Sequence, residues 1–514
     1  MKAHTHIIFV VVGILFMLAA CKSSPRVLPV LPVNEVGDTY LTEEIAPVKA
    51  PFAMPELKKP VFPDTIVRLC RTDVSDYMQT DYINRRINEL SKAGGGTVSL
   101  EHGKWQSGRI ELKSNINLHV PEGTEIHFSG EAKDYLPVVF TKFESEECLS
   151  SGAFIYANNQ DNIALTGRGK LVGPPLDGVL FHSFWEQFNN RTMKKIDPDT
   201  PVEERIYDGS AAGIPMFLPK TFSPINCKNV LVEGIRIEGS LTWNIAPIYC
   251  ENVIIRGINV YSVGVPTGDG IDIESSKNVL IEYSTLSNGD DCFTVKAGRG
   301  RDGLRVNKPS ENIVIRYCLA LEGHGGVTCG SETAAGIKNL YVHDCVFDNT
   351  MSGLRFKTRR GRGGGGDSLY FERIRMKSSV YALHWDMLGS QQFMGELAER
   401  YPLREVTPLT PAYRNISMKD IVIENTKRFI DASGIPESPL FNVRIENITV
   451  SCEKLPRFTD VDGFYIKNVQ VTSQDSIMEL VDARNITFDN VDMNLPGELQ
   501  MNKTGHLTGN ITIK

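Results

Sequence analysis

From about residue 229 onward, the chain repeats a short pattern in which an Asn is followed by apolar residues in alternation. Strong copies begin at Asn229, Asn252, Asn278, Asn312, Asn339, Asn415, Asn442 and Asn485, and weaker copies begin at Ser368 and Gly463. Apolar alternation with a period of two, bounded by Gly, Asn or Ser turns, predicts short β-strands. Most copies follow the previous one after about 21 to 34 residues, a step that is typical of solenoid coils.

This repeat predicts an all-β fold, a parallel β-helix that spans residues 64–514 as one domain. A single coil cannot bury its inward side chains, so each coil stacks on the next and the core runs along the axis. Asn suits the stacked turns, because its amide can form a ladder and its backbone tolerates left-handed angles. A β-sandwich or a propeller is the alternative, but propeller blades need longer, four-stranded repeats.

The N-terminal end of such a solenoid needs a cap, because an open end exposes apolar core and unpaired strand edges. A short helix is predicted in this place, with Ile83, Ile87 and Leu90 on one face. Thr80 can cap the start of the helix, and Gly94 can end it.

The first residues indicate export. Residues 1–21 have a positive start, an apolar stretch and a final Leu-Ala-Ala-Cys, which resembles a bacterial lipobox. Cleavage before Cys21 would leave this Cys as a lipidated first residue that anchors the protein to a membrane. The alternative is an ordinary signal peptide or membrane anchor. We expect an exported lipoprotein in the periplasm or at the cell surface, anchored in the outer membrane if the cell is Gram-negative.

Residues 22–63 are rich in Pro. Pro fixes its own φ and lacks a backbone donor, so this segment is not expected to be helical and predicts an extended tether. The expected organisation is therefore a lipoprotein signal peptide (1–21), a Pro-rich tether (22–63) and a β-helix domain (64–514).

The 514 residues carry a formal net charge of −7, and 41% of them are hydrophobic, enough to bury a large core. The negative charge disfavours a nucleic-acid partner, which needs a basic face. It also disfavours an acidic polymer, unless basic residues gather locally. The ten Cys contain no CxxC pair, and neither a metal site nor another cofactor is expected.

Three carboxylates define the candidate chemistry. Asp290 and Asp291 follow Asp269 after about one repeat, so stacking brings the three acids to one surface. Like charges held close together raise the pKa of one member, which can create a protonated acid beside an ionised base. Taken singly, Asp-Gly and Asp-Asp are most often turn residues.

Two later motifs extend this surface. His324 lies in a Gly-His-Gly-Gly segment, and alone it would more often be a structural histidine. Arg355 and Lys357 alternate with Phe356, so both point away from the core on one face. They are either solvated cations or a cationic site for an acidic sugar.

Together these segments resemble glycoside hydrolase family 28, the polygalacturonase family of right-handed parallel β-helices. The family motifs Asn-Thr-Asp, Gly-Asp-Asp, Gly-His-Gly and Arg-Ile-Lys have counterparts here in the same order. They stand as Thr267-Gly268-Asp269, Gly289-Asp290-Asp291, Gly323-His324-Gly325 and Arg355-Phe356-Lys357. The resemblance covers the chain from about residue 70 to the C-terminus.

The resemblance implies inverting hydrolysis of α-1,4-galacturonosyl bonds in pectin. Asp290 would be the general acid that protonates the leaving oxygen. Asp269 and Asp291 would activate and position the attacking water as the general base, about 6.5–9.5 Å from the acid. His324 would support the protonation state of the acid.

The resemblance also implies substrate contacts. Arg355 and Lys357 would bind a galacturonate carboxylate. Thr267 is expected to contact the substrate near the base, although it replaces the family Asn and a Gly replaces the following Thr. The family aromatic that follows the Arg-x-Lys motif has only Tyr381 and Trp385 as candidates.

Two Arg- and Gly-rich segments, 298–303 and 358–363, resemble those of bacterial exo-acting members, and the aromatic insertion at 181–215 could form another wall. We therefore expect exo action from the non-reducing end, whereas mobile surface loops are the alternative. The residues expected to hold terminal uronates in these segments are Arg299, Arg301 and Arg360. The local cations that would offset the negative net charge are Arg299, Arg301, Arg305, Lys308, Arg355, Lys357, Arg359, Arg360 and Arg362.

Three other functions are compatible with a β-helix. A rhamnogalacturonan or other branched-pectin hydrolase of the same family would share the mechanism. A pectate lyase would eliminate instead, with Ca²⁺ that the acid cluster could bind. A non-catalytic β-helix would only bind glycans at the surface.

Overall fold

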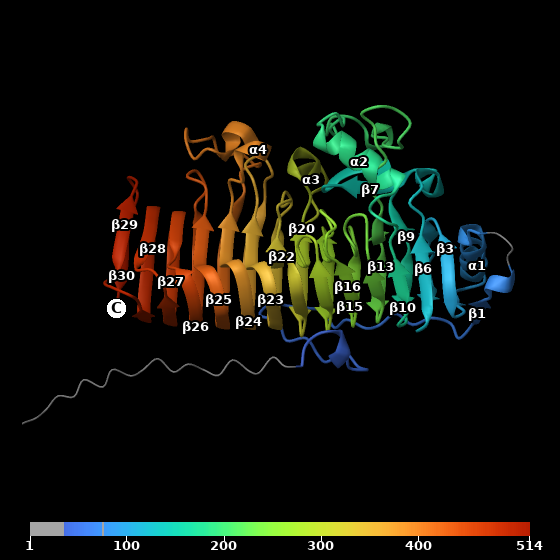
Figure 1. The fold of residues 1–514 in the computed structure, drawn as a ribbon, viewed down its shortest axis with the longest axis horizontal. Coiled ribbons are helices and arrows are strands. Elements are labelled where there is room, and N and C mark those ends of the chain that lie inside the picture. The colour runs from blue at the N-terminus through green and yellow to red at the C-terminus, as the bar shows by residue number, and fades with distance from the viewer. Residues whose placement is uncertain (1–34, 74–76) are drawn as a thin grey trace, which may run out of the picture.

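The computed structural model describes residues 35–73 and 77–514. These residues form a right-handed parallel β-helix, an elongated solenoid that runs from α1 (Thr80–Lys92) at one end to β30 (Gly509–Ile513) at the other (Figure 1). The predicted fold class is confirmed. The predicted signal peptide with Cys21 lies outside the described residues.

Three stacks of strands make up the solenoid. The first comprises β1 (Ile66–Leu69), β2 (Gly96–Leu100), β5 (Ile116–His119), β10 (Asp161–Thr166), β13 (Lys228–Glu233), β15 (Glu251–Arg256), β18 (Lys277–Glu282), β21 (Ser310–Arg316) and β30. The second comprises β3 (Gly103–Ser107), β6 (Thr124–Phe128), β11 (Lys170–Val172), β14 (Arg236–Glu238), β16 (Asn259–Ser262) and β19 (Thr285–Asn288). The third comprises β4 (Ile110–Glu111), β9 (Ala153–Asn158), β12 (Lys220–Ile225), β17 (Ile271–Glu274), β20 (Phe293–Lys296) and β29 (Gln500–Thr504).

Longer strands bend from one stack into the next. They are β22 (Leu319–Cys329), β23 (Ile337–Lys357), β24 (Gly365–Asp386), β25 (Ala412–Ser433), β26 (Leu440–Lys454), β27 (Arg457–Ser473) and β28 (Ile477–Asn494). Pairing between successive coils is parallel, whereas β7 (Val139–Phe143) and β8 (Glu146–Ser150) form an antiparallel hairpin.

Short helices decorate the solenoid. The α-helices besides α1 are α2 (Val179–Asn189), α3 (Gly300–Val306) and α4 (Gln391–Met394). The 3-10 helices are η1 (Asp38–Tyr40), η2 (Arg71–Asp73), η3 (Ala132–Tyr135), η4 (Val202–Glu204) and η5 (Gly395–Ala398). The hairpin β7–β8 and helices α2, α3 and α4 all rise from one flank of the solenoid (Figure 1). Among residues 35–73 and 77–514, no helix is both long and apolar enough to cross a membrane.

Helix α1 caps the N-terminal end of the core, and Ile83 and Ile87 are fully buried as predicted. The prediction for the start of the helix is wrong in one detail. Gln79 occupies the N-cap position, and Thr80 is the first helical residue. The Thr80 hydroxyl accepts a hydrogen bond from the backbone N–H of Gly108 at 2.7 Å, so it ties the helix to the first coils instead of capping it.

The repeated Asn residues form the expected ladder along the first stack. Each amide nitrogen donates to the amide oxygen one coil earlier at 3.0 to 3.2 Å, through Asn162, Asn229, Asn252, Asn278, Asn312 and Asn339. All six have left-handed backbone angles, with φ between 53° and 58°. At the weaker copy, Asp367 takes the place in the ladder and accepts from Asn415 at 2.9 Å. The ladder therefore explains why Asn recurs at these turns.

Asn278→Ala tests the ladder in the middle of the chain. The variant loses the bonds to Asn252 and Asn312, each 3.2 Å long, and places a Cβ-bearing residue without a polar side chain at φ 56°. We expect a loss of about 2–3 kcal/mol in the free energy of unfolding, measured by urea denaturation. Asn278→Gly tolerates the left-handed backbone but still lacks the amide, so its free energy of unfolding should lie between those of the wild type and Asn278→Ala. The control is Asn502→Ala on β29, and an equal loss there would contradict the role of the ladder.

Residues 35–63, named the strap here, lie along the flank opposite to α2 (Figure 1). Its apolar side chains, among them Phe52 and Leu57, cover an outward row formed by Ala164, Leu231, Ile254, Leu280, Val314 and Tyr341. Two buried guanidinium groups reach the backbone of the strap. Arg256 donates to the carbonyl oxygen of Thr42 at 2.8 Å, and Arg316 donates to that of Ala46 at 2.7 Å.

The strap changes the expected organisation, because residues 35–63 of the predicted tether are docked on the β-helix. The segment is extended, as its Pro content predicts. Its backbone carbonyl oxygens still need donors where the strap is covered, and Arg256 and Arg316 supply them. Residues 22–34 lie outside the described residues.

Candidate active site

The three predicted acids meet on the third stack. Asp269 precedes β17, Asp290 and Asp291 precede β20, and these two strands pair in parallel. One carboxylate oxygen from each acid lies within 4.8 Å of those from the other two. His324 on β22 and Arg355 on β23 come from the next two coils. The stacking of coils thus brings together residues that are far apart in sequence.

Asp291 is the ionised member of the cluster. Its side chain is fully buried, and its two oxygens accept from Arg355 Nη1 at 3.1 Å and from Lys357 Nζ at 2.7 Å. Burial alone would raise the pKa of Asp291, but the two cations outweigh it and hold the pKa well below its usual range. Arg355 and Lys357, the two cations predicted to bind substrate, therefore also neutralise Asp291 within the site. Arg355 Nε is buried and has no partner in the described chain, so this fork keeps a donor for a ligand.

The carboxyl group of Asp269 favours the opposite protonation state to that of Asp291. It is 4% exposed, and burial together with the neighbouring Asp272 raises its pKa well above the usual value. Its nearest cation, Lys296 Nζ, is 3.9 Å away and is shared with Asp272 at 3.7 Å. Asp269 therefore favours the protonated form, whereas Asp291 favours the charged form.

Asp290 is the accessible acid. Its side chain is 24% exposed, and its Oδ1 lies 3.0 Å from His324 Nδ1. The same oxygen accepts from the backbone N–H of Asp291 at 2.9 Å. The hydrogen bond to Asp290 raises the pKa of His324 above its usual value. His324 therefore keeps its ring proton to higher pH than a free imidazole would.

Lys296, Asp272 and Glu332 were not predicted as parts of the site. Lys296 is buried and contacts Glu332 at 3.2 Å as well as the two acids Asp269 and Asp272. A signal existed in the alternation of β17 and β20, which directs Asp272 and Lys296 away from the core. It was weak, because a charged residue at an outward position is ordinarily solvated.

The acid cluster could in principle hold a divalent cation, because three carboxylates converge on it. The site already contains positive charge, however. Arg355 and Lys357 occupy both oxygens of Asp291, and Lys296 lies beside Asp269. This donor set suits a water molecule and an anionic sugar better than a metal ion.

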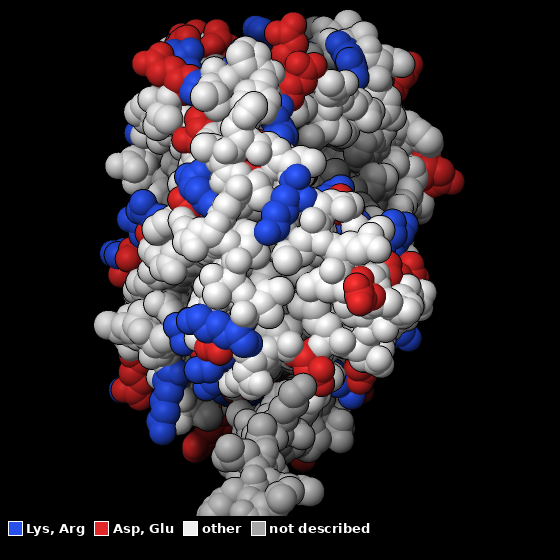
Figure 2. All heavy atoms as spheres, turned by 90° about the vertical axis from the view of Figure 1, so that its left-hand side faces the viewer, with Lys and Arg blue, Asp and Glu red and all other residues white. Residues whose placement is uncertain are grey.

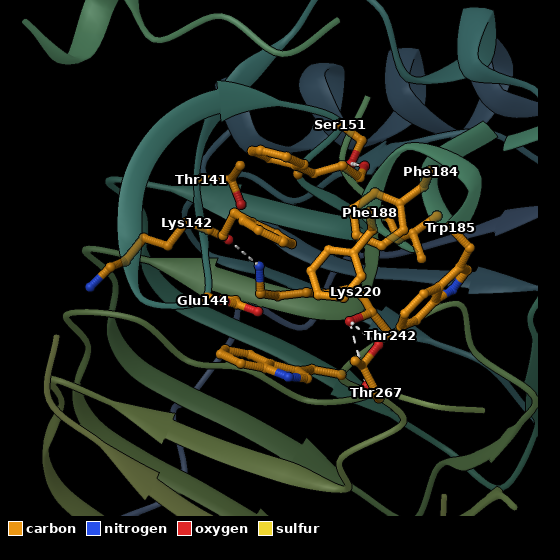
Figure 3. Close-up of a pocket in the computed structure, with 15 residues that line it drawn as sticks. Thr141, Lys142, Glu144, Ser151, Phe184, Trp185, Phe188, Lys220, Thr242 and Thr267 are labelled. Carbon is orange, nitrogen blue, oxygen red and sulfur yellow. Dashed lines mark hydrogen bonds between the residues drawn. The ribbon is translucent and has the colours of Figure 1, made fainter. Parts of the chain in front are cut away.

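An aromatic pocket adjoins the acids on the side of the N-terminal coils (Figure 3). It is lined by Trp243 and by Phe184 and Trp185 of α2, so the insertion that contains α2 forms a wall, as expected. Thr267 also lines the pocket, and its hydroxyl donates to Thr242 Oγ1 at 3.2 Å. The predicted substrate residue Thr267 thus faces a cavity next to Asp269.

The hairpin β7–β8 closes the pocket and is clamped to the solenoid by buried contacts. Lys142 pairs with Glu274 at 2.5 Å, with both side chains buried. Glu147 accepts from the Tyr249 hydroxyl at 2.8 Å, and its backbone N–H donates to Asp302 at 2.9 Å. The wall of the pocket is therefore preformed.

Arg299 and Arg301 lie at the start of α3 and contact the surrounding walls. Arg299 pairs with Glu144 at the tip of the hairpin β7–β8. Arg301 is largely exposed and pairs with Asp199 of the insertion. The two residues tie α3 to neighbouring loops, and neither contacts the three acids.

Arg360 is placed away from the acids. It is 5% exposed and pairs with Glu437 at 2.5 and 2.8 Å. Its remaining donors reach the backbone carbonyl oxygens of Leu397 and Arg400, both at 3.1 Å. These contacts brace the segment around α4 and leave little of this guanidinium for a ligand.

Most of the cations that were expected to form a free basic surface are instead paired with acids from other parts of the sequence. Further pairs are Arg305 with Glu147, Arg359 with Asp386 and Arg362 with Glu332. Viewed from the C-terminal end, basic and acidic side chains are interspersed on the surface (Figure 2). The sequence could not show this, since the acidic partners come from other loops.

The two aromatic candidates have different positions. Trp385 is fully buried and stacks on Phe356 in the core with ring centroids 4.8 Å apart. Tyr381 packs on His384 at 4.2 Å, and His384 is the neighbour of Arg355 in the next coil. Of the two, only Tyr381 lies where it can extend the site beyond Arg355.

Fold and site together define a β-helix glycoside hydrolase. The model of glycosyl hydrolases family 28 matches residues 210–388, the part that carries the three acids, His324 and Arg355. The match covers about a third of the chain and is to the same family that the four motifs resemble.

Similar proteins cover most of the chain. A probable polygalacturonase of Vitis vinifera is 27% identical over 405 residues, which are 75% of this chain and 74% of that protein. An endo-polygalacturonase of Pectobacterium carotovorum is 25% identical and covers 76% of this chain and 87% of its own. The crystal structure of a hyperthermoactive exopolygalacturonase from Thermotoga maritima has a TM-score of 0.69 at 29% identity, covering 85% of this chain and 94% of its own.

Proposed function

We propose that the protein hydrolyses α-1,4-galacturonosyl linkages of pectin with inversion at the anomeric carbon. One observation carries the proposal. Asp290, an accessible acid that is hydrogen-bonded to His324, lies beside Asp291, an acid kept ionised by Arg355 and Lys357. A site that pairs a proton donor with a charged carboxylate is what glycoside hydrolysis requires.

In the proposed reaction, Asp290 gives its proton to the glycosidic oxygen while the bond from that oxygen to C1 breaks. Water attacks C1 from the opposite face, and the proton that it releases passes to Asp291. Asp269 orients this water through its own hydrogen bond. Arg355 and Lys357 receive the substrate carboxylate on the side of the C-terminal coils.

The short spacing of the acids bears on the stereochemistry. Inverting enzymes generally hold acid and base about 6.5–9.5 Å apart and retaining ones about 5–5.5 Å apart, whereas here the nearest oxygens lie within 4.8 Å. Retention needs a carboxylate that is free to attack C1. Asp291 is held by two cations, and Asp269 favours its protonated form, so attack by water is the better supported route.

Exo action from the non-reducing end is the finer proposal. The hairpin β7–β8 and helix α2 line the pocket beside the acids on the side of the N-terminal coils, where a long chain would otherwise continue. The structural similarity to the exopolygalacturonase of Thermotoga maritima supports it, whereas the Pectobacterium relative is an endo enzyme.

Digestion of polygalacturonate with chromatography of the products over time tests this function. We expect galacturonate from the first time point, released as the β-anomer in ¹H NMR. A spread of oligomers would contradict exo action but not hydrolysis. Unsaturated, ultraviolet-absorbing products that disappear with EDTA would instead identify a lyase. Activity on branched pectin but not on polygalacturonate would indicate a branched-pectin hydrolase of the same family.

His324→Gln should change the pH profile. The pKa of His324 is raised by Asp290, so His324 keeps its proton above the usual imidazole value of about 6.5 and loses it as the pH rises further. The variant has no ionisable imidazole beside Asp290, and the basic limb of kcat/KM should move to lower pH. The measurement is kcat/KM from pH 4 to 9. An unchanged limb would contradict this role of His324.

We further propose that the protein is exported and anchored through Cys21. The support is the Leu-Ala-Ala-Cys sequence at the end of the apolar segment. Metabolic labelling with a fatty-acid analogue should mark the full-length protein and not its Cys21→Ser variant. Equal labelling of both proteins, or of neither, would refute the anchor.

A further inference from the structure

Asp269 and Asp272 are two buried acids that share one cation. Asp269 is 4% exposed, and Asp272 is fully buried. Among the residues that the structure describes, only Lys296 has a side-chain cation within 4.0 Å of either carboxylate, at 3.9 Å from Asp269 and 3.7 Å from Asp272. Neither oxygen of Asp272 has a hydrogen-bond partner in the same part of the chain. Both acids therefore depend on this one ammonium group to compensate their charge.

The charges around Lys296 balance only if one acid keeps a proton. Lys296 Nζ also lies 3.2 Å from Glu332, whose other carboxylate oxygen pairs with Arg362. Three acids thus face two cations in a cluster made of Asp269, Asp272, Glu332, Lys296 and Arg362. An uncompensated negative charge is costly when it is buried, so the cluster retains one proton. Burial raises the pKa of Asp272 to about 7, in agreement with this count.

The ammonium group of Lys296 is fixed in place and stays charged. The residue is 4% exposed, and the ring centre of Trp243 lies 4.7 Å from Nζ, so the aromatic face adds to the attraction of the acids. Burial lowers the pKa of Lys296, but the surrounding acids outweigh burial and raise it. At 3.7 and 3.9 Å, its effect on Asp272 and Asp269 is electrostatic, because these distances exceed those of a hydrogen bond.

We propose that Lys296 is a positioning residue that keeps one negative charge on the Asp269–Asp272 pair, so that Asp269 holds the attacking water firmly. The inference rests on the proposed function, in which Asp269 orients this water. A hydrogen bond to a charged acceptor is about twice as strong as one to a neutral acceptor. A second proton on the pair would therefore weaken the hold on the water. The proton that the water releases still passes to Asp291, and Lys296 neither gains nor loses one.

Other charged groups face the acid pair from the neighbouring elements. They are Lys142 on β7, Lys220 on β12, Glu274 on β17, Asp290 and Asp291 before β20, Glu332 after β22, and Arg355 and Lys357 on β23. Several of these are already paired, Lys142 with Glu274 and both cations of β23 with Asp291. Lys296 is thus the group whose removal acts on the pair most directly.

Lys296→Met tests the proposal, because it keeps the aliphatic stem and removes the charge. Without the cation both acids bind protons more readily, so the acidic limb of kcat/KM should move up by about one pH unit or more. Near the acidic limb we expect a loss of about 10- to 100-fold in kcat, with KM changed less than about threefold. Lys296→Arg keeps the positive charge and should bring the limb back toward the wild-type position. The measurement is the pH profile of kcat and KM on polygalacturonate.

Two further variants keep the test decisive if Lys296→Met does not fold. Asp272→Asn serves as the reference, because its amide is neutral like the protonated acid. Adding Lys296→Met to it removes an acid and a cation together, so Asp272 is not left buried as an unpaired charge. The acidic limb of this double variant should still lie about one pH unit above that of Asp272→Asn, because Asp269 has lost its cation.

Lys277→Met is the matched control, because this Lys on β18 has a side chain that is 53% exposed. It should keep the wild-type pH profile. An unmoved acidic limb in the variants that lack Lys296, or an equal shift in the control, would overturn the role of Lys296. A loss confined to KM would overturn it too, because Lys296 would then bind substrate instead of positioning Asp269.

Infrared titration of the carboxyl groups separates this inference from the proposed function, because it does not require hydrolysis. Lys296→Met should keep one more protonated carboxyl group to higher pH than the wild type. If the wild type fails to hydrolyse polygalacturonate while the titration shows this difference, the proposed function is refuted and the control of the acid pair by Lys296 is supported. Hydrolysis by the wild type together with identical titration curves for the two proteins would refute the role of Lys296 alone.

Discussion

Asp290→Asn should reduce kcat on polygalacturonate by about 10³-fold with little change in KM. The amide has the shape of the acid but cannot give a proton to the leaving oxygen. Asp290 is 24% exposed at the surface of the cluster, so the change is not expected to cost much stability. Steady-state release of reducing ends measures the effect, and thermal unfolding checks the fold.

The matched control for this result is Asp492→Asn, the same substitution at an exposed position of β28. It should leave kcat unchanged. A small loss in Asp290→Asn, within tenfold of the control, would remove Asp290 from the role of general acid. Asp269→Asn should then be measured, since Asp269 is the other member of the cluster that favours its protonated form.

Arg256→Met should produce the largest loss of stability, about 3–5 kcal/mol in the free energy of unfolding. The guanidinium is fully buried between Glu282 at 2.8 Å and Glu233 at 3.0 Å, and it also donates to the strap at Thr42. Removing it leaves Glu282, itself buried, with Arg316 as its remaining cation. Guanidinium chloride denaturation followed by circular dichroism measures the loss.

Arg444→Met is the control, because this Arg is 52% exposed and pairs with Glu446 on the surface. Its loss should stay below about 1 kcal/mol. Activity of folded Arg256→Met should equal that of the wild type, since the strap lies on the flank opposite to the hairpin β7–β8 and α2, which line the pocket beside the acids (Figure 1). A loss no larger than that of Arg444→Met would show that the strap adds little to stability.

The fold and the acid cluster could be predicted because both follow from the repeat. Period-two alternation identifies the strands, and a step of one coil places Asp269 next to Asp290 and Asp291 without any knowledge of side-chain contacts. Asn278 and its equivalents were interpreted correctly for the same reason, since a stacked turn has one backbone angle and one hydrogen-bond partner in every coil.

Most of what escaped prediction lies outside the repeat. The partners of Arg299 and Arg360 are Glu144 and Glu437, on segments whose position no periodicity defines. Their charges were therefore counted as free when they are neutralised.

The strap also limits the distance between the catalytic acids and a membrane. If Cys21 carries the proposed anchor, only residues 22–35 can bridge the distance between lipid and protein, because Val36 is buried on the β-helix and the N–H of Gly37 donates to the carbonyl oxygen of Tyr317. Fully extended, that length reaches about 45 Å. The hairpin β7–β8 and helix α2, which line the pocket beside the acids, lie on the flank opposite to the strap (Figure 1). An anchored molecule would thus lie close to the lipid surface with this pocket turned outward, toward polymer that arrives from solution.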